Sequence, residues 1–223
     1  MDKTYAIAID GPSGAGKSSL ARSVARELGF VYVDTGAIYR TVGWAVLRRG
    51  AEDAAVAALL PEVRITMDYG ADGEQRMYLN GEDVSANIRL PEVSMTASRV
   101  SALPEVRAFL LDMQRSIAEK NNVIMDGRDI GTVVLPQADV KIFLTASVED
   151  RARRRYRELC QRGTEKDFDQ LLREIQQRDY NDAHRAAAPL RQAEDAVVLD
   201  TTGNTFQQSR QQILDIIRER IGL

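Results

Sequence analysis

The stretch AIAIDGPSGAGKSSLARSVARELGF, residues 6–30, constrains the fold of this chain more than any other. It begins with a short apolar run, continues through a glycine-rich turn and passes into an amphipathic pattern over Lys17–Leu28 that stops at Gly29. The turn, GPSGAGKS, fits the pattern G-x-x-x-x-G-K-[ST], in which the backbone N–H groups of the loop and the start of the next helix hold phosphates. Because a buried strand precedes the turn and a helix follows it, we predict a phosphate-binding loop rather than an incidental turn.

Each part of this loop has an expected task. The glycines allow the backbone N–H groups to turn inward and form an anion nest. Lys17 is expected to reach the β and γ phosphate oxygens of a nucleoside triphosphate, and the Ser18 hydroxyl is expected to bind Mg²⁺. The residues of this loop predicted to bind ATP are Gly11, Pro12, Ser13, Gly14, Ala15, Gly16, Lys17, Ser18 and Ser19.

Composition narrows the classes of protein and of site. The chain has 223 residues, enough for one domain with a sizeable core, and a net charge of -3, which argues against coating a nucleic acid polymer. Cys160 is the single cysteine and His184 the single histidine, which excludes an internal disulfide and a thiolate metal site and argues against a Ser-His-Asp triad. The sequence shows neither a signal-peptide pattern nor an apolar run of the roughly 20 residues that span a bilayer, so we expect a cytoplasmic protein that does not enter a membrane.

Five short apolar runs, rich in β-branched residues and without polar alternation, are typical of strands buried on both faces of a parallel sheet. They are Tyr5–Asp10, Phe30–Asp34, Asn122–Asp126, Val140–Leu144 and Ala196–Asp200. Helical patterns lie between them, and Ser147–Asp150 and Thr205–Gln208 resemble capping boxes that open two later helices. This alternation predicts a doubly wound α/β fold, with a five-stranded parallel sheet flanked by helices and ligands beyond the carboxyl ends of the strands.

One segment, at about 62–85, departs from this plan. Apolar and polar residues alternate over Val63–Tyr69 and again from Met77 to Leu79, and turn signals lie in GADGE and in Asn80-Gly81. This pattern predicts a small antiparallel β insertion in a protein that otherwise has a parallel sheet. We expect the insertion on the active-site side, where it would help a binding region to close.

The phosphate loop alone does not choose among kinases, GTPases and motor ATPases. The guanine-specifying pattern N-K-x-D is absent from the sequence, which weakens the GTPase alternative. Arginines instead gather near strand ends and on later helices, in DTGAIYR, DGRDIG, RARRRYR and RDYNDAHR. Arginine binds phosphate oxygens with a planar fork and keeps its charge when water is excluded, so these clusters favour a kinase whose acceptor is itself a phosphate. The alternatives are a solvated helix face for RARRRYR and an ion pair along one helix for Arg178, Asp182 and Arg185.

Eight motifs, in their order along the chain, resemble those of the bacterial cytidylate (CMP/dCMP) kinase family: DGPSGAGKS, DTGAIYR, LNGEDVS, DGRDIGTVV, KIFLTAS, RARRR, RDYNDAHRAAAPL and LDTT. The resemblance runs over essentially the whole chain and implies a P-loop nucleoside monophosphate (NMP) kinase that phosphorylates CMP and dCMP with ATP and Mg²⁺. It implies a single domain and favours a monomer. The implied boundaries are a core over 1–34, 100–146 and 164–223, an NMP-binding region over 35–99 that moves, and a short helical lid at about 147–163.

The family's roles carry over to the matching positions of this sequence. The implied CMP-binding residues are Thr35, Tyr39, Arg40, Ser98, Arg107, Arg128, Asp129, Arg178 and Asp182. Those expected to read the cytosine edge are Ser98, Arg107 and Asp129. Those expected to hold a phosphate are Arg40 and Arg128, and those expected on the sugar are Arg178 and Asp182. The implied ATP contacts in the lid are Arg151 and Arg155, and the implied catalytic residues are Lys17, Arg128, Arg154 and Arg185. Asp126 would orient Mg²⁺ through water, together with Ser18.

Two positions depart from the family pattern. Thr35 stands where serine is common, which keeps a hydroxyl. Ser18-Ser19 stands where some members have Gly-Thr, so the magnesium hydroxyl lies open between the two serines, and the loop alignment favours Ser18. Two other functions also stay open: a kinase for another small acceptor, such as UMP or a metabolite hydroxyl, and a nucleotide-dependent switch without transfer activity. The sequence does not rank CMP against dCMP or say which lid arginine touches ATP.

Overall fold

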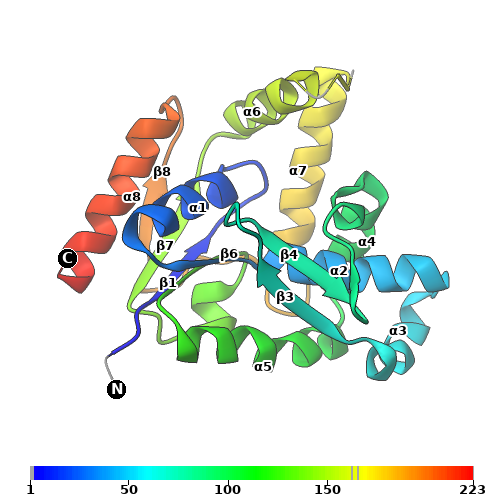
Figure 1. The fold of residues 1–223 in the computed structure, drawn as a ribbon. Helices are drawn as coiled ribbons and strands as arrows, with labels where there is room; N and C mark the ends of the chain where they lie inside the picture. Colours follow the sequence, from blue (N-terminus) through cyan, green and yellow to red (C-terminus); the bar gives the residue numbers. More distant parts are fainter. Residues whose placement is uncertain (1–2, 162, 165, 223) are drawn as a thin grey trace. The chain divides into compact units, whose positions relative to one another are not determined.

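The computed structural model gives the fold of nearly the whole chain (Figure 1). It describes residues 3–161, 163–164 and 166–222. Outside the described residues lie positions 1, 2, 165 and 223 of the predicted core and position 162 of the predicted lid.

Two compact units make up the chain. The first unit contains Met1–Tyr32 and Lys120–Leu223, and the second contains Val33–Glu119. The predicted NMP-binding region lies within the second unit, which also takes in residues 100–119 that the sequence placed in the core. The predicted lid lies within the first unit. That these segments bind a nucleotide and move stays a prediction.

A five-stranded parallel sheet forms the centre of the first unit, which confirms the predicted fold class. Its strands, in spatial order, are β2 (Val31–Asp34), β6 (Val123–Gly127), β1 (Ala6–Asp10), β7 (Val140–Thr145) and β8 (Val197–Asp200). The boundary between the two units falls within β2. Strand β1 is in parallel register with β6 on one side and β7 on the other, so that Asp10 lies opposite Gly127 and Phe143. The carboxyl ends of these three strands therefore form one edge.

The ends of the strands differ by one residue from the prediction. Strand β2 begins later because the Phe30 N–H still donates to the Ala25 carbonyl in the turn that closes α1 (Lys17–Leu28). Strand β6 also begins later, because the Asn122 side chain accepts a hydrogen bond from the Tyr5 N–H at 2.8 Å. Strands β1 and β8 likewise start one residue after the predicted position, and β7 continues one residue beyond it.

Helices α1 and α8 (Phe206–Ile221) pack against each other and against the sheet, α1 on β1 and β6 and α8 on β7 (Figure 1). Their apolar faces and the strands enclose one core cluster, because burial of apolar side chains is the main favourable term in folding. Its fully buried members include Ile7, Ile9, Val24, Ile124, Leu144, Ile213 and Leu214. Within the described part of the chain, no helix is both long and apolar enough to cross a bilayer.

The remaining helices of the first unit, α6 (Val148–Gln161) and α7 (Phe168–His184), pack side by side (Figure 1). They share a small apolar cluster of Ala152, Leu171 and Ile175. A short helical segment, η3, covers Ile130–Val134 after β6. Helix α6 covers most of the predicted lid.

One of the two predicted capping boxes is complete. At the start of α8, the Thr205 hydroxyl accepts from the Gln208 N–H, and the Gln208 side chain accepts from the Thr205 N–H. At the start of α6, the Asp150 N–H donates to the Ser147 hydroxyl at 3.2 Å, but the Ser147 N–H donates to the Thr202 hydroxyl at 2.8 Å. The second predicted box is therefore wrong in one of its two hydrogen bonds, because the Asp150 side chain does not accept from the Ser147 N–H. Aspartate is shorter than the glutamate or glutamine that completes such a box.

The second unit combines helices with a three-stranded antiparallel sheet. Its helices are α2 (Thr35–Arg49), α3 (Asp53–Leu59), η1 (Leu60–Glu62), η2 (Asn87–Arg89), α4 (Pro91–Val100) and α5 (Pro104–Lys120), of which the last residue belongs to the first unit. Its strands, in spatial order, are β3 (Ile65–Tyr69), β4 (Gln75–Leu79) and β5 (Glu82–Asp83). The antiparallel pairing confirms the predicted insertion. At its second turn, Asn80 and Gly81 have positive φ values of 51° and 87°, which suits a tight hairpin.

Helix α2 packs closely on α4 within this unit. The contact centres on Gly43, because a Cβ built there would lie 2.9 Å from the Ala97 backbone nitrogen and 3.1 Å from the Ala97 Cα. Glycine in the middle of a helix costs about 0.5–1 kcal/mol relative to alanine. Close approach of the two helix backbones is what offsets that cost.

Gly43→Ala should therefore lower the free energy of unfolding, by about 1–3 kcal/mol, because the added methyl group overpacks the contact with α4. Urea unfolding of the full chain measures the effect. Helix propensity alone predicts the opposite sign, a gain of about 1 kcal/mol. An increase in stability of that size would show that the two helices do not approach as closely as the structure indicates.

Candidate active site

The phosphate loop predicted from the sequence joins the end of β1 to α1. Three of its glycines have positive φ, at 148° for Gly11, 76° for Gly14 and 89° for Gly16. Gly11 has no room for a side chain, since its Cβ would lie 1.9 Å from the Leu144 carbonyl oxygen in β7. Lys17, the first residue of α1, donates from its ammonium to the Pro12 carbonyl at 2.7 Å. The loop thus lies against the carboxyl end of the sheet, with its lysine folded back into it.

Lys17 is buried among charged side chains of the first unit. Burial lowers its pKa well below the usual 10.5, and the positive charge of Arg128 lowers it further. The carboxylates of Asp126 and Asp10 raise this pKa, whereas Arg178 adds to the lowering. The positive charges of Arg128 and Arg178 thus disfavour the charged form of Lys17, and an anion placed beside the lysine would favour it.

A carboxylate and a hydroxyl that suit a hard divalent cation lie next to this lysine. Ser18 Oγ donates to Asp126 Oδ2 at 2.9 Å, and the Tyr32 hydroxyl donates to Asp126 Oδ1 at 2.7 Å. Such oxygen atoms fit Mg²⁺, which binds through one or two protein oxygens together with phosphate and water. Sequence reasoning missed Tyr32, because an aromatic residue inside an apolar strand is indistinguishable from core.

Asp10, the last residue of β1, ties the start of the phosphate loop to the DGRDIG segment. Its carboxylate accepts hydrogen bonds from the Ile130 N–H at 2.8 Å and from the Gly131 N–H at 2.7 Å. Burial raises its pKa from 3.8 to about 6, against the lowering effect of these two bonds. Sequence reasoning did not include Asp10 in the site, although it stands beside Gly11 in the DGPSGAGKS motif.

Two arginine–carboxylate pairs join DGRDIG to the end of α7. Arg128 Nε donates to Asp182 Oδ2 at 2.8 Å, and Arg185 Nη2 lies 3.5 Å from Asp129 Oδ1. The structure thus brings together four residues that the sequence singled out in two separate motifs. The sequence placed Arg185 on this helix, but α7 ends at His184 and the backbone of Arg185 is extended.

The charge of Asp182 is stabilised by arginines from both segments. Burial alone would raise its pKa, but the charge and the hydrogen bond of Arg128 and the charges of Arg178 and Arg185 outweigh burial and lower the pKa. Asp182 forms its ion pair with Arg128, 54 positions away in the sequence, at 2.8 Å. Asp182 thus has an ion-pair partner outside its own helix, in addition to the nearby charges of Arg178 and Arg185.

The three arginines of the predicted lid that the resemblance assigned to a site differ in their environments. Arg151 is buried, and its Nη1 donates to the Ser13 carbonyl at 3.0 Å. Arg154 donates from Nη1 to the Ala15 carbonyl at 3.2 Å. Arg155 is exposed and pairs with a glutamate of its own helix. A solvated helix face therefore describes Arg155, whereas Arg151 and Arg154 hold carbonyl groups of the phosphate loop.

Two further residues, missed by sequence reasoning, hold these arginines. Asp179 Oδ2 lies 2.6 Å from Arg151 Nη1, and the Thr201 carbonyl accepts from Arg154 Nη2 at 2.6 Å. Thr201 belongs to the LDTT motif, which was a usable signal. Asp179 belongs to the RDYNDAHR motif, which was likewise a usable signal, although sequence reasoning assigned it no role.

In the second unit, the N-terminus of α2 holds the first group of predicted residues. Asp34 Oδ1 accepts from the Ala37 N–H at 2.9 Å and caps the helix, while Asp34 Oδ2 accepts from Arg40 Nη2 at 2.8 Å. Thr35, the first helical residue, is buried. The Gln75 side chain on β4 accepts from the Asp34 N–H at 2.8 Å, so the β insertion supports the start of α2. Sequence reasoning assigned no role to Asp34 or Gln75.

The second group of predicted residues in this unit gathers around Arg107. Its guanidinium lies over the Tyr39 ring, 5.5 Å from the centroid, and donates to the Ser101 carbonyl at 3.1 Å. The Ser101 hydroxyl donates in turn to the Ser98 carbonyl at 2.8 Å. Helices α2, α4 and α5 therefore bring Tyr39, Ser98 and Arg107 together. Their contacts with a nucleotide stay predictions.

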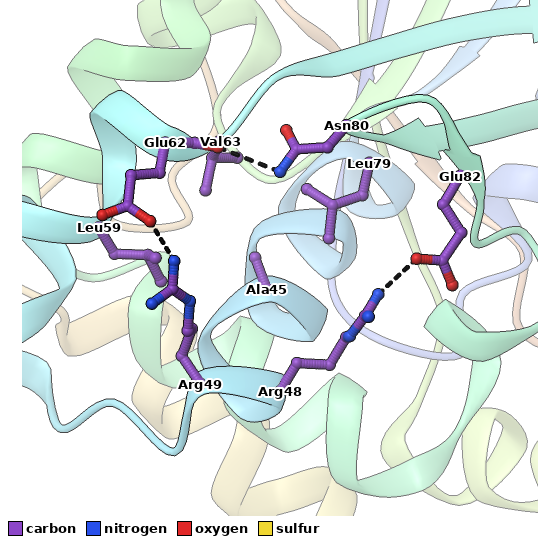
Figure 2. Close-up of a pocket in the computed structure, with 9 residues that line it drawn as sticks. All are labelled: Ala45, Arg48, Arg49, Leu59, Glu62, Val63, Leu79, Asn80 and Glu82. Carbon is purple, nitrogen blue, oxygen red and sulfur yellow. Dashed lines mark hydrogen bonds and ion pairs between the residues drawn. The ribbon is translucent and has the colours of Figure 1, made fainter.

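A cavity of about 360 Å³ lies elsewhere in the second unit (Figure 2). Its lining residues are Ala45, Arg48, Arg49, Leu59, Glu62, Val63, Leu79, Asn80 and Glu82. Arg48 pairs with Glu82 at 2.5 Å and Arg49 pairs with Glu62, so the charges at its rim cancel. None of the predicted site residues is among those that line it, and its neutral rim offers no preference for phosphate.

Comparison with known proteins identifies the family. The family model described as cytidylate kinase matches residues 7–219. The chain belongs to the cytidylate kinase family. A relative named cytidylate kinase from Streptococcus pyogenes serotype M5 (strain Manfredo) is 50% identical over 204 residues, which are 90% of each chain. Another, from Caldicellulosiruptor saccharolyticus, is 49% identical over 223 residues, which are 99% of this chain and 98% of the relative.

The fold of this cytidylate kinase family member also resembles a solved structure of low sequence identity. A gluconokinase from Sinorhizobium meliloti 1021 has a TM-score of 0.50 and is 13% identical, covering 100% of this chain and 97% of that one. The likeness concerns the fold alone. The resemblance to cytidylate kinases on which the sequence interpretation depended is confirmed by the family match and by the two relatives.

Asp10 should make the stability of this family member depend on pH with a defined sign. Its pKa is about 6 in the folded chain and 3.8 without the fold, so the folded state holds the proton more tightly. The stabilising contribution of the protonated group is full below about pH 4 and is lost as the pH rises through about 6, a change on the order of 3 kcal/mol.

The Asp10→Asn variant cannot titrate at this position and should lack that slope. Urea unfolding of both proteins across the acidic range measures the difference between their free energies of unfolding, in which the other carboxylates cancel. Parallel pH profiles of the two proteins would contradict a buried, proton-binding Asp10.

Proposed function

We propose that this protein transfers the γ-phosphoryl group of ATP to the phosphate of CMP or dCMP and so forms CDP or dCDP in pyrimidine nucleotide metabolism. The observation that carries the proposal is the cationic cluster at the phosphate loop, where Lys17 is buried and lies close enough to Arg128 and Arg178 for their charges to lower its pKa. A triphosphate facing a monophosphate would add negative charge to this cluster, beyond that of Asp10, Asp126 and Asp182. Relatives named cytidylate kinase, about half identical over nearly the whole chain, support a cytidine nucleotide as the acceptor.

ATP would bind at the phosphate loop. Lys17 would exchange the Pro12 carbonyl for β and γ phosphate oxygens, which favours its charged form. Mg²⁺, when bound, neutralises charge on the phosphates, and Ser18 and Asp126 would hold it, Asp126 through water. The proposed loop contacts are Gly11, Pro12, Ser13, Gly14, Ala15, Gly16, Lys17, Ser18 and Ser19, and the arginines proposed to act on the ATP side are Arg151, Arg154 and Arg155.

CMP would be recognised by its phosphate, sugar and base. The proposed contacts from the first unit are Arg128, Asp129, Arg178 and Asp182. Those from the second unit are Thr35, Tyr39, Arg40, Ser98 and Arg107. Asp129 is buried, so its carboxylate would accept from the exocyclic amino group of cytosine. Uracil presents a carbonyl oxygen at that place and would leave both acceptors unpaired, which is a strong basis for discrimination.

The chemistry requires little from a general base. The acceptor phosphate oxygen is already anionic, so catalysis comes from in-line positioning and from charge stabilisation of the transferred group. The residues proposed to stabilise that charge are Lys17, Arg128, Arg154 and Arg185. The predicted movement of the NMP-binding region and the lid would exclude water, which otherwise would accept the phosphoryl group.

The proposed enzyme acts on small molecules in the cytoplasm, as a monomer and without a nucleic acid or membrane partner. The net charge of -3 supports the absence of a polyanionic partner. The exposed, unpaired Cys160 agrees with a reducing compartment.

A panel of acceptors tests the transfer reaction. With ATP and Mg²⁺, ADP release should require an acceptor and be fastest with CMP or dCMP, ahead of UMP, other nucleoside monophosphates and metabolite hydroxyls. Lys17→Ala, which removes one charged donor from the transferred group, should lower turnover by about two to three orders of magnitude. Slow ATP hydrolysis that no acceptor changes would instead identify a nucleotide-dependent switch.

Asp129→Asn should reduce the preference for CMP over UMP. The side chain keeps its shape, but its amide can donate to the uracil carbonyl, so the ratio of kcat/KM for CMP to that for UMP should fall about tenfold to a hundredfold. A coupled assay with both acceptors measures this ratio. Asp215→Asn, an exposed position on α8, is the matched control and should keep it. An unchanged ratio in Asp129→Asn would remove this residue from base recognition.

A further inference from the structure

Arg151, which the sequence placed in a lid, lies buried under the phosphate loop. Its side chain is only 4% exposed. Nε donates to the Ala146 carbonyl at 2.9 Å, and Nη1 donates to the Ser13 carbonyl at 3.0 Å. A Cβ built on Gly14 would lie 3.3 Å from the Arg151 Cβ, so the next residue of the loop packs on the same side chain. Two consecutive loop residues thus rest on Arg151.

Asp179 holds this guanidinium in place. Its Oδ2 lies 2.6 Å from Arg151 Nη1, and its Oδ1 is buried and accepts no hydrogen bond from the described residues. Asp179 lies on α7 and Arg151 at the start of α6, so the ion pair also joins these two packed helices. Because Arg151 is buried, loss of its carboxylate partner would leave a poorly compensated charge beneath the loop.

The hydrogen bonds of the loop carbonyls fix the direction in which the loop N–H groups point, because the C=O and N–H of one peptide group lie in one plane. The loop binds phosphate with backbone N–H groups, so the corresponding carbonyls turn away from the ligand. A buried carbonyl needs a donor on the side that it faces. Arg151 supplies such a donor to Ser13, and Arg154 supplies one to Ala15.

We propose that Asp179 is a positioning residue for ATP binding: it holds Arg151 against the Ser13 carbonyl and thereby keeps the N–H groups of the loop aimed at the phosphates. We call Arg151 and Asp179 the loop clamp. The inference rests on the proposed ATP site. Asp179 lies in the RDYNDAHRAAAPL motif, but the family resemblance assigns it no role, and its neighbour Arg178 is proposed for the other substrate.

Asp179→Asn tests the loop clamp, because it keeps the shape of the side chain and removes the charge that holds Arg151. Steady-state kinetics of the full chain should show KM for ATP about tenfold higher, while KM for CMP changes by less than about twofold. Asp179→Glu keeps the charge and should recover part of the ATP affinity. Glu174→Gln, which removes the exposed partner of Lys166 on the same helix, is the matched control and should leave both constants within about twofold.

A double-mutant cycle with Arg151→Lys separates the loop clamp from other causes. Both residues act through one contact, so Arg151→Lys should raise KM for ATP little further in the Asp179→Asn background. Additive effects of the two substitutions would overturn the proposal. A change in KM for ATP of Asp179→Asn no larger than that of the control would also overturn it. A rise confined to KM for CMP would overturn it as well, because such a rise would assign the effect to Arg178.

Two measurements keep the outcome interpretable. Thermal unfolding identifies variants that have lost their fold. If Asp179→Asn does not fold, KM for ATP is compared between Asp179→Glu and wild type instead. Dissociation constants of a non-hydrolysable ATP analogue provide the same comparison without turnover. A wild-type chain that binds the analogue but does not phosphorylate CMP would refute the proposed function and still test the loop clamp.

Discussion

The burial of Lys17 at the carboxyl end of the sheet is the constraint on which the site depends. Desolvation and the nearby Arg128 disfavour its charge, and Asp126 and Asp10 favour it. A protein interior accommodates such a group only where opposite charges and hydrogen bonds are fixed close by. Here the two carboxylates come from neighbouring strands, since Asp10 ends β1 and Asp126, which pairs with Ile9 in the parallel register, lies one residue from the end of β6. The pairing of parallel strands therefore sets the electrostatics of the site.

The same loop is held at its start and on its carbonyl side. At its start, Asp10 accepts hydrogen bonds from the backbone N–H groups of Ile130 and Gly131 and so connects the loop to the segment that carries Arg128. Behind it, Arg151 and Arg154 bind two of its carbonyls. A glycine-rich loop has little stiffness of its own, because glycine loses more conformational freedom on ordering than any other residue. Its shape is supplied by side chains from β1 and α6.

Local patterns predicted the elements of this fold well. The phosphate loop, the five strands, the capping box of α8 and the Asn80-Gly81 hairpin all depend on residues that are close in sequence, and the structure confirms them. The errors occur where a residue forms a hydrogen bond with a partner that its strand or capping pattern does not include. The strand ends shifted by one residue where Phe30 and Asn122 found other hydrogen-bond partners. A capping box failed at α6 where the Ser147 N–H found the Thr202 hydroxyl, 55 positions away.

The sequence by itself determined the family, the order of the elements and the residue types that can hold phosphate, because these follow from short motifs and their spacing. Tertiary structure decided which of those residues meet. Arg128 forms a hydrogen bond with Asp182, 54 positions away in the sequence. Tyr32 does so with Asp126, 94 positions away, and Arg151 with the Ser13 carbonyl, 138 positions away. No periodicity encodes such pairs, since they arise only when packed strands and helices bring distant side chains within hydrogen-bond distance. Asp179 shows the limit most clearly: it lies in a recognisable motif beside Arg178, but only the packing of α6 on α7 gives Asp179 its partner.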